Sequence, residues 1–93
     1  SGYYNSVSVH LHPEHIEGLR GALAGMDDIS GIEVGNSDGS LAQVTVMSRE
    51  GATIVEAVNT RIRENDISVE QLYVERGRLD DVFRQITSDG GAR

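Results

Sequence analysis

Residues 6–23 read SVSVHLHPEHIEGLRGAL, and they carry two hydrophobic periods in succession. Valine and leucine alternate with serine and histidine from Ser6 to His12, a period of two that is typical of a half-buried strand. Pro13 suits the first position of a helix, because the N–H that it lacks has no intrahelical partner there. Apolar residues then recur at helical spacing up to Met26. The stretch therefore predicts a strand that leads directly into an amphipathic helix.

A turn sequence and a second helical pattern follow. Apolar alternations at residues 29–34 and 41–47 flank Gly-Asn-Ser-Asp-Gly at 35–39, which predicts a hairpin because these residue types favour tight turns. Apolar residues recur at helical spacing over residues 54–62, and the Asn-Asp pair at 65–66 closes this second helix.

A fourth strand completes the pattern. Ile67 and Val69 begin it, and Leu72 and Val74 continue it on the opposite parity, so we expect a bulge near residues 70–71. The order β-α-β-β-α-β predicts an α+β fold, a ferredoxin-like sandwich with both helices on one face of the sheet. The other face should be polar or serve as a contact surface, and it should carry Ser6, Ser8, His10, Gln43 and Thr45.

An additional C-terminal helix is predicted after the fourth strand. Its apolar stripe has no obvious place in a two-layer core, so it either packs on its own sheet or docks on another chain. The stripe consists of Leu79, Val82, Phe83 and Ile86. We expect a cloning scar and linker at residues 1–3, one domain over residues 4–88 and a flexible tail over residues 89–93.

The composition excludes several classes of function. The chain has 93 residues, a net charge of −7, no cysteine and no lysine. Cysteine chemistry and lysine Schiff bases are therefore excluded, and so is a lysine-bearing phosphate loop. The acidic balance disfavours nucleic-acid binding, which depends on neutralising phosphates. No apolar run approaches the ~18 residues that a membrane span needs, so we expect no direct membrane insertion.

Three groups of residues could form a metal-binding or acid–base site. His10, His12 and His15 could ligate zinc or nickel only if the last two converged across the strand-to-helix junction. The acid pair at 27–28 is most simply a loop pair, and the pair at 80–81 fits the first turn of a helix. We predict no catalytic residues, no metal site and no cofactor-binding residues in this chain.

Residues 75–87 read ERGRLDDVFRQIT. They resemble the C-terminal signature of bacterial ABC transporter ATP-binding subunits of the daunorubicin-resistance-like drug-export type, roughly R-P-S-L-E-D-V-F-x-x-L-T. Gly77 and Arg78 depart from the proline and serine of that pattern, and losing the serine cap would weaken the start of the helix by about 0.5–2 kcal/mol. The matching positions are Arg76, Leu79, Asp80, Asp81, Val82, Phe83 and Thr87.

The resemblance implies a non-catalytic C-terminal domain that supports ATPase dimerisation or controls transport. ATP and Mg²⁺ would belong to a separate nucleotide-binding domain. The partners would be that domain, a second copy of the subunit and a membrane permease, on the cytoplasmic side of the bacterial inner membrane. The implied partner-docking or packing motif comprises Leu79, Asp80, Asp81, Val82, Phe83, Arg84 and Ile86.

An alternative remains open at this point. Ferredoxin-like regulatory domains of the amino-acid-binding type share this order of elements and sense small molecules. The turn at residues 35–39 and the strand-to-helix junctions would then frame a pocket.

Overall fold

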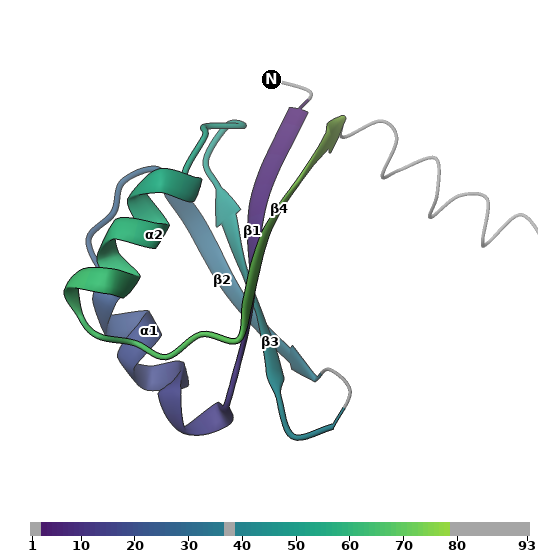
Figure 1. Cartoon of the computed structure of the whole chain (residues 1–93). Helices are drawn as coiled ribbons and strands as arrows, with labels where there is room; N and C mark the ends of the chain where they lie inside the picture. The colour runs from purple at the N-terminus through teal and green to yellow at the C-terminus, as the bar shows by residue number, and fades with distance from the viewer. Residues whose placement is uncertain (1–2, 37–38, 79–93) are drawn as a thin grey trace, which may run out of the picture.

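The strands and helices follow the predicted order (Figure 1). The computed structural model describes residues 3–36 and 39–78. The elements are β1 (Tyr3–Leu11), the 3-10 turn η1 (Pro13–His15), α1 (Ile16–Leu23), β2 (Ile29–Asn36), β3 (Ala42–Ser48), α2 (Val55–Glu64) and β4 (Gln71–Arg78). This is the predicted ferredoxin-like α+β fold. The additional helix predicted after β4 lies outside the described residues.

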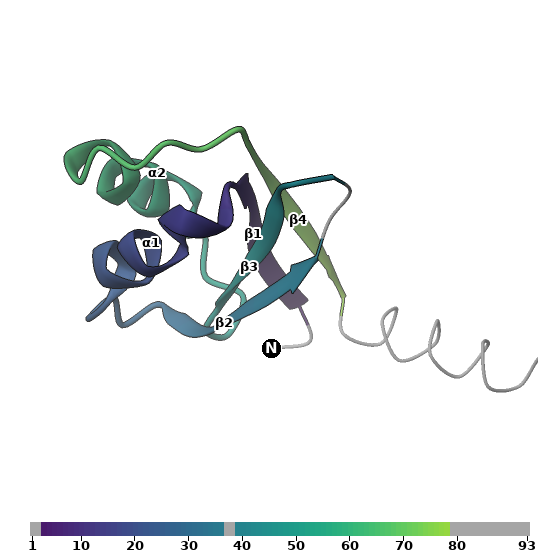
Figure 2. The same cartoon turned by 90° about the horizontal axis from the view of Figure 1, so that it is seen from below.

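The four strands form one antiparallel sheet in the order β2-β3-β1-β4. Both helices lie on the same face of this sheet (Figure 2). The register sets Val7 opposite Val46 on β3 and Val74 on β4, and Ile32 on β2 completes this row. The rows through residues 6–10 of β1 cross all four strands, and alternate rows point to opposite faces.

The hydrophobic core lies between the sheet and the helices. Val7, Val9 and Leu11 are at most 1% exposed, and Val44 and Val46 on β3 lie beside them, fully buried. The helices contribute Leu19, Leu23, Val58 and Ile62, with Ile54 just before α2. The period of two in β1 thus places its aliphatic side chains under the helices.

The first helix begins later than predicted. Pro13 opens a 3-10 turn, in which the His15 N–H donates to the His12 carbonyl at 2.9 Å, and α1 begins at Ile16. Such turns are common at the N-termini of helices. Gly25, at φ +83°, follows the end of α1 in the left-handed region that glycine adopts without strain.

The predicted start of the fourth strand is wrong. Asp66 adopts φ +53°, and the Ile67 N–H donates to the Ile62 carbonyl at 3.1 Å, which is the C-terminal cap of α2. Ile67 and Val69 then pack against the core from the connection to β4. The ladder begins where the Glu70 N–H donates to the His10 carbonyl.

The predicted bulge in the fourth strand is also wrong. β4 pairs with β1 in one unbroken register from Gln71 to Arg78. The change of parity seen in the sequence is the passage from a connection to a strand. The irregularity in the sheet lies instead in β2, where the register shifts between Ile29 and Gly31.

A hydrogen bond from Arg61 links the two helices. One Arg61 guanidinium nitrogen donates to the Ala22 carbonyl at 2.9 Å, near the C-terminal end of α1. Carbonyls there lack intrahelical partners, and positive charge favours that end of the helix dipole. We expect Arg61→Met to lower the free energy of unfolding by about 1.5 kcal/mol, measured by urea denaturation.

The matched control is Arg63→Met. Arg63 lies on the same helix and is exposed, so we expect a change within about 0.5 kcal/mol. Equal effects of the two substitutions would show that the contact between Arg61 and Ala22 does not stabilise the helix pair.

Candidate functional site: the uncovered face of the sheet

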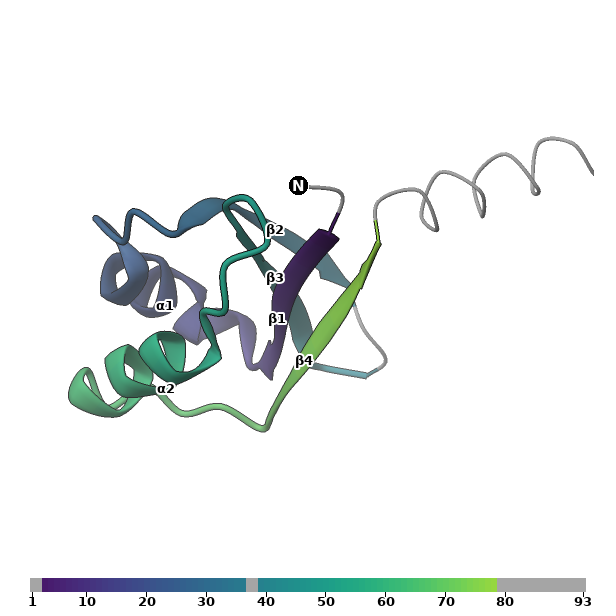
Figure 3. The ribbon, with the colours of Figure 1, turned by 90° about the horizontal axis from the view of Figure 1, so that it is seen from above.

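One face of the sheet carries no helix among the described residues, and we call its side chains the polar face (Figure 3). The sequence predicted five of its members, and the register confirms their shared face. The residues of the polar face are Ser6, Ser8, His10, Glu33, Gln43, Thr45, Met47, Gln71, Tyr73 and Glu75.

The floor of the polar face is made by two serines of β1, an inner strand of the sheet. Ser8 is 0% exposed and Ser6 is 5% exposed. The Ser8 hydroxyl accepts a hydrogen bond from the Gln43 amide at 3.5 Å, and the Ser6 hydroxyl donates to the Glu75 carbonyl at 3.5 Å. Both hydroxyls are buried and partnered, so neither is placed to act as a nucleophile.

The rim of the polar face combines an aromatic ring with carboxylates. Tyr73 is 38% exposed, and its hydroxyl lies 3.5 Å from Nε2 of His10, with the two rings 5.7 Å apart. Glu75 follows on the same strand and face, about 7 Å along β4. Glu33 lies on the opposite edge strand, in the row that Thr45, Ser8 and Tyr73 complete.

The polar face also carries negative charge. Its described positions hold two glutamates and no arginine. The sequence analysis did not single out Tyr73, Glu75, Glu33 or Met47. Alternation along a strand could have identified three of them. Met47 lies two residues from Thr45, and Tyr73 and Glu75 lie two and four residues from Gln71, so each points to the same face as that polar residue. Glu33 is assigned to this face only by the register.

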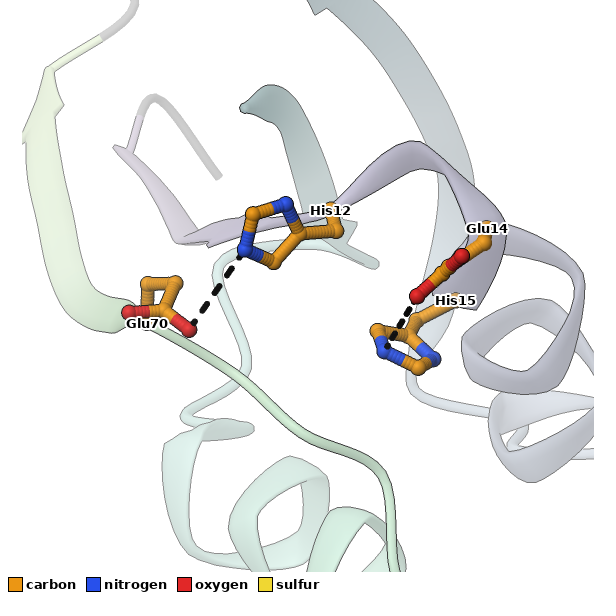
Figure 4. A network of polar contacts seen from close by, with 4 residues as sticks. All are labelled: His12, Glu14, His15 and Glu70. Carbon is orange, nitrogen blue, oxygen red and sulfur yellow. Dashed lines mark ion pairs between the residues drawn. The ribbon is translucent and has the colours of Figure 1, made fainter. Parts of the chain in front are cut away.

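The three histidines do not converge. His12 and His15 turn to different carboxylates: His12 Nε2 lies 3.9 Å from Glu70, and His15 Nε2 lies 3.6 Å from Glu14 (Figure 4). His10 lies on the polar face. Within residues 3–36 and 39–78, no three His, Cys, Asp or Glu side chains gather closely enough to hold a metal ion.

The acid pair at 27–28 lies in the loop before β2 and is held through its backbone. The Arg49 side chain donates to the Asp27 carbonyl at 2.9 Å and to the Ile29 carbonyl at 3.3 Å. The backbone N–H of Arg49 donates to the Asp28 carbonyl. The carboxylates take no part in these bonds. Arg49 therefore fixes the start of β2, a structural role that no pattern in the sequence indicated.

Two other predictions concern the C-terminal motif and a ligand pocket. The motif from Leu79 to Ile86 lies outside the described residues. A hollow of about 360 Å³ lies on α2, and neither the turn at 35–39 nor a strand-to-helix junction lines it. Its lining residues are Glu56, Asn59, Thr60 and Arg63.

In the part of the chain that the structure describes, no helix is long and apolar enough to span a membrane.

Comparison with known proteins shows a likeness to a solved structure. No protein-family model matches the sequence, and no curated protein matches it. Among solved structures, the chain resembles the C-terminal domain of the MgtC protein from Mycobacterium tuberculosis, with a TM-score of 0.59 and 17% identity. The match covers 84% of this chain and 92% of that domain. At this identity the likeness establishes a shared fold.

This finding contradicts the resemblance to ABC transporter ATP-binding subunits. The structural neighbour is a domain of another protein, so the predicted role in drug export, the ATP-binding and permease partners and the place in an exporter complex are corrected. The error has a physical origin. The motif occupies residues 75–87, of which only 75–78 are described, and these are residues of an edge strand. The upstream pattern of hydrophobicity is what any ferredoxin-like sandwich requires.

Proposed function

We propose that this chain is a non-catalytic binding domain of a larger protein. We propose further that the polar face binds a protein partner that presents arginine or lysine. The observation that supports this most directly is that an exposed aromatic ring, Tyr73, and the carboxylate of Glu75 lie two residues apart on a face whose described positions hold no arginine.

The chemistry of that pair favours a cation. A guanidinium or ammonium group stacks favourably on a tyrosine ring and gains about 0.5–1 kcal/mol at an exposed site. A carboxylate two residues along the same strand can accept hydrogen bonds from the same group, and charge-assisted bonds of this kind are among the stronger ones. Glu33 adds a second negative charge on the far edge of the face.

Two further features support the proposal. The chain carries a net charge of −7, which speeds encounter with a basic surface. The similar structure is itself the C-terminal domain of a larger protein. The serine hydroxyls on the face are buried and the histidines are separated, so binding accounts for the geometry better than catalysis does.

The test uses a peptide of alternating glycine and arginine as the probe, at physiological salt. We expect Glu33→Gln combined with Glu75→Gln to weaken binding about tenfold by fluorescence anisotropy, because each exposed pair contributes about 0.2–1 kcal/mol and tenfold corresponds to about 1.4 kcal/mol. Tyr73→Ala should weaken binding as well, because it removes the ring.

The control changes the net charge equally at another place. Glu56→Gln combined with Glu64→Gln removes two exposed carboxylates from α2, and binding should change by less than about twofold because screened charges beyond ~8 Å contribute little. Equal weakening by both double variants would mean that net charge alone attracts the peptide, and the proposal would be wrong.

A further inference from the structure

His10 is a titratable side chain of the polar face to which the proposed function gives no role. It is half-buried, and its Nε2 lies 3.5 Å from the hydroxyl of Tyr73. The two ring centroids are 5.7 Å apart, and the ring planes are inclined by 43°. His10 therefore lies directly beside the aromatic ring on which the partner's cation is proposed to stack.

The protonation state of His10 decides what it offers to that ring. Histidine is the side chain that changes charge between about pH 5 and 8. A neutral ring whose Nε2 carries no proton accepts a hydrogen bond from the Tyr73 hydroxyl, whereas both nitrogens of a protonated ring are donors. A cation within about 6 Å of an aromatic centroid is attracted to the ring. Protonated His10 would itself be a cation within this distance of Tyr73.

The side chains that stand opposite His10 carry no charge. They are Gln43 on β3 and Gln71 on β4, and an amide does not titrate. The Glu70 N–H donates to the His10 carbonyl, but the Glu70 carboxylate lies 3.9 Å from Nε2 of His12 (Figure 4). This carboxylate is therefore placed to interact with His12.

The two glutamates of the polar face lie farther from His10. Side chains on one face of a strand repeat about every 7 Å, and neighbouring strands are about 4.8 Å apart. The register then places the backbone of Glu33 and of Glu75 about 12–14 Å from that of His10. Charges at such separations are largely screened at physiological salt. The charge of His10 therefore acts chiefly at Tyr73.

We propose that protonated His10 competes with the partner's cation for the Tyr73 ring, so that the polar face releases its partner as the pH falls. This inference rests on the proposed function, because it concerns the same cation site. At higher pH, neutral His10 holds the Tyr73 hydroxyl and leaves the ring free. At lower pH, the imidazolium is attracted to the ring and repels the incoming guanidinium or ammonium group. Binding is therefore stronger on the basic side of the transition.

The test repeats the anisotropy titration with the glycine–arginine peptide and the full chain at constant salt, at about pH 8 and about pH 5.5. We expect binding to be about threefold weaker at the lower pH, which is within the range that one exposed cation–π contact contributes. His10→Gln keeps a polar side chain without a titratable ring, so its binding should change by less than about 1.5-fold. His15→Gln is the matched control, because His15 lies in the turn before α1 beside Glu14, and it should retain the full pH dependence.

A second measurement needs no substitution. Because coupling between two binding events is reciprocal, the bound peptide must lower the pH at which His10 takes up its proton. A threefold effect corresponds to about half a pH unit. Nuclear magnetic resonance of the histidine ring protons should show this displacement for His10 when the chain is saturated with peptide. The distant His15 should move by less than about 0.1 unit.

Two results would contradict the role of His10. One is an unchanged pH dependence in His10→Gln, and the other is an equal reduction by His10→Gln and His15→Gln, which would assign the effect to net charge. Binding that requires Glu33 and Glu75 but shows neither pH effect overturns this inference alone. A peptide that does not bind at about pH 8, or that is weakened equally by both double variants, overturns the proposed function and this inference with it.

Discussion

Leu19→Ala is expected to lower the free energy of unfolding by about 3 kcal/mol. Leu19 is fully buried and lies in the core cluster, where α1 otherwise contributes Leu23 and the small side chain of Ala22. The substitution removes buried methyl groups and leaves a cavity under a helix of only eight residues. A domain of this size has a total stability of about 5–14 kcal/mol, so the loss is a large fraction of the whole.

Urea denaturation followed by far-ultraviolet circular dichroism measures this change. Glu17→Ala is the control on the same helix, because the Glu17 side chain is 89% exposed and forms only a surface pair with Arg20. We expect the control to stay within about 0.5 kcal/mol of the original protein. A loss below about 1 kcal/mol for Leu19→Ala would mean that α1 is not anchored by this side chain.

The sequence determines the two faces of β1 well, because their difference is chemical and regular. Aliphatic residues alternate with serine and histidine, and a strand must point them to opposite sides. The prediction that Ser6, Ser8 and His10 share a face with Gln43 and Thr45 is therefore confirmed. The full burial of Ser6 and Ser8 was not predictable from the pattern, because alternation assigns a face and not a degree of exposure.

The start of the fourth strand shows the opposite case. Ile67 and Val69 have the spacing of a strand, but the cap of α2 and the first ladder bond at Glu70 make them a connection. Hydrophobic spacing over so few residues does not distinguish a strand from an extended segment that packs on the core. The left-handed backbone at Asp66 separates the end of α2 from the connection to β4. The Asn-Asp pair at 65–66 indicated the end of the helix but not this conformation.

The candidate site depends on long-range pairing. Tyr73 and His10 are 63 residues apart in sequence, and they meet because β4 joins the edge of the sheet beside β1. The predicted order of elements implies this neighbourhood, but the register that aligns Tyr73 with Ser8 comes only from the structure. The exposed aromatic ring beside Glu75 was therefore not recognised from the sequence.

Asn5 is a further residue that the pattern leaves unexplained. It has the same parity as Val7, Val9 and Leu11, so its side chain lies on the helix-facing side, where an apolar residue is expected. Its side-chain amide donates to the carbonyls of Gly51 and Ala52. These carbonyls belong to the segment between β3 and α2, and both residues are half-buried. Asn5 thus closes the end of the core by holding the approach to α2.

Asn5→Ala is accordingly expected to lower the free energy of unfolding by about 2 kcal/mol, because it leaves two half-buried carbonyls without their donor. Hydrogen exchange should rise first in residues 51–55, the segment that the amide holds. Asn65→Ala is the control: the Asn65 amide is exposed and donates to the Arg61 carbonyl within one helix end, so the expected loss is at most about 0.5 kcal/mol. If both variants lost the same stability, the amide of Asn5 would be an ordinary surface contact. If Asn5→Ala alone lost stability while exchange rose uniformly, it would act on the whole core rather than on this segment.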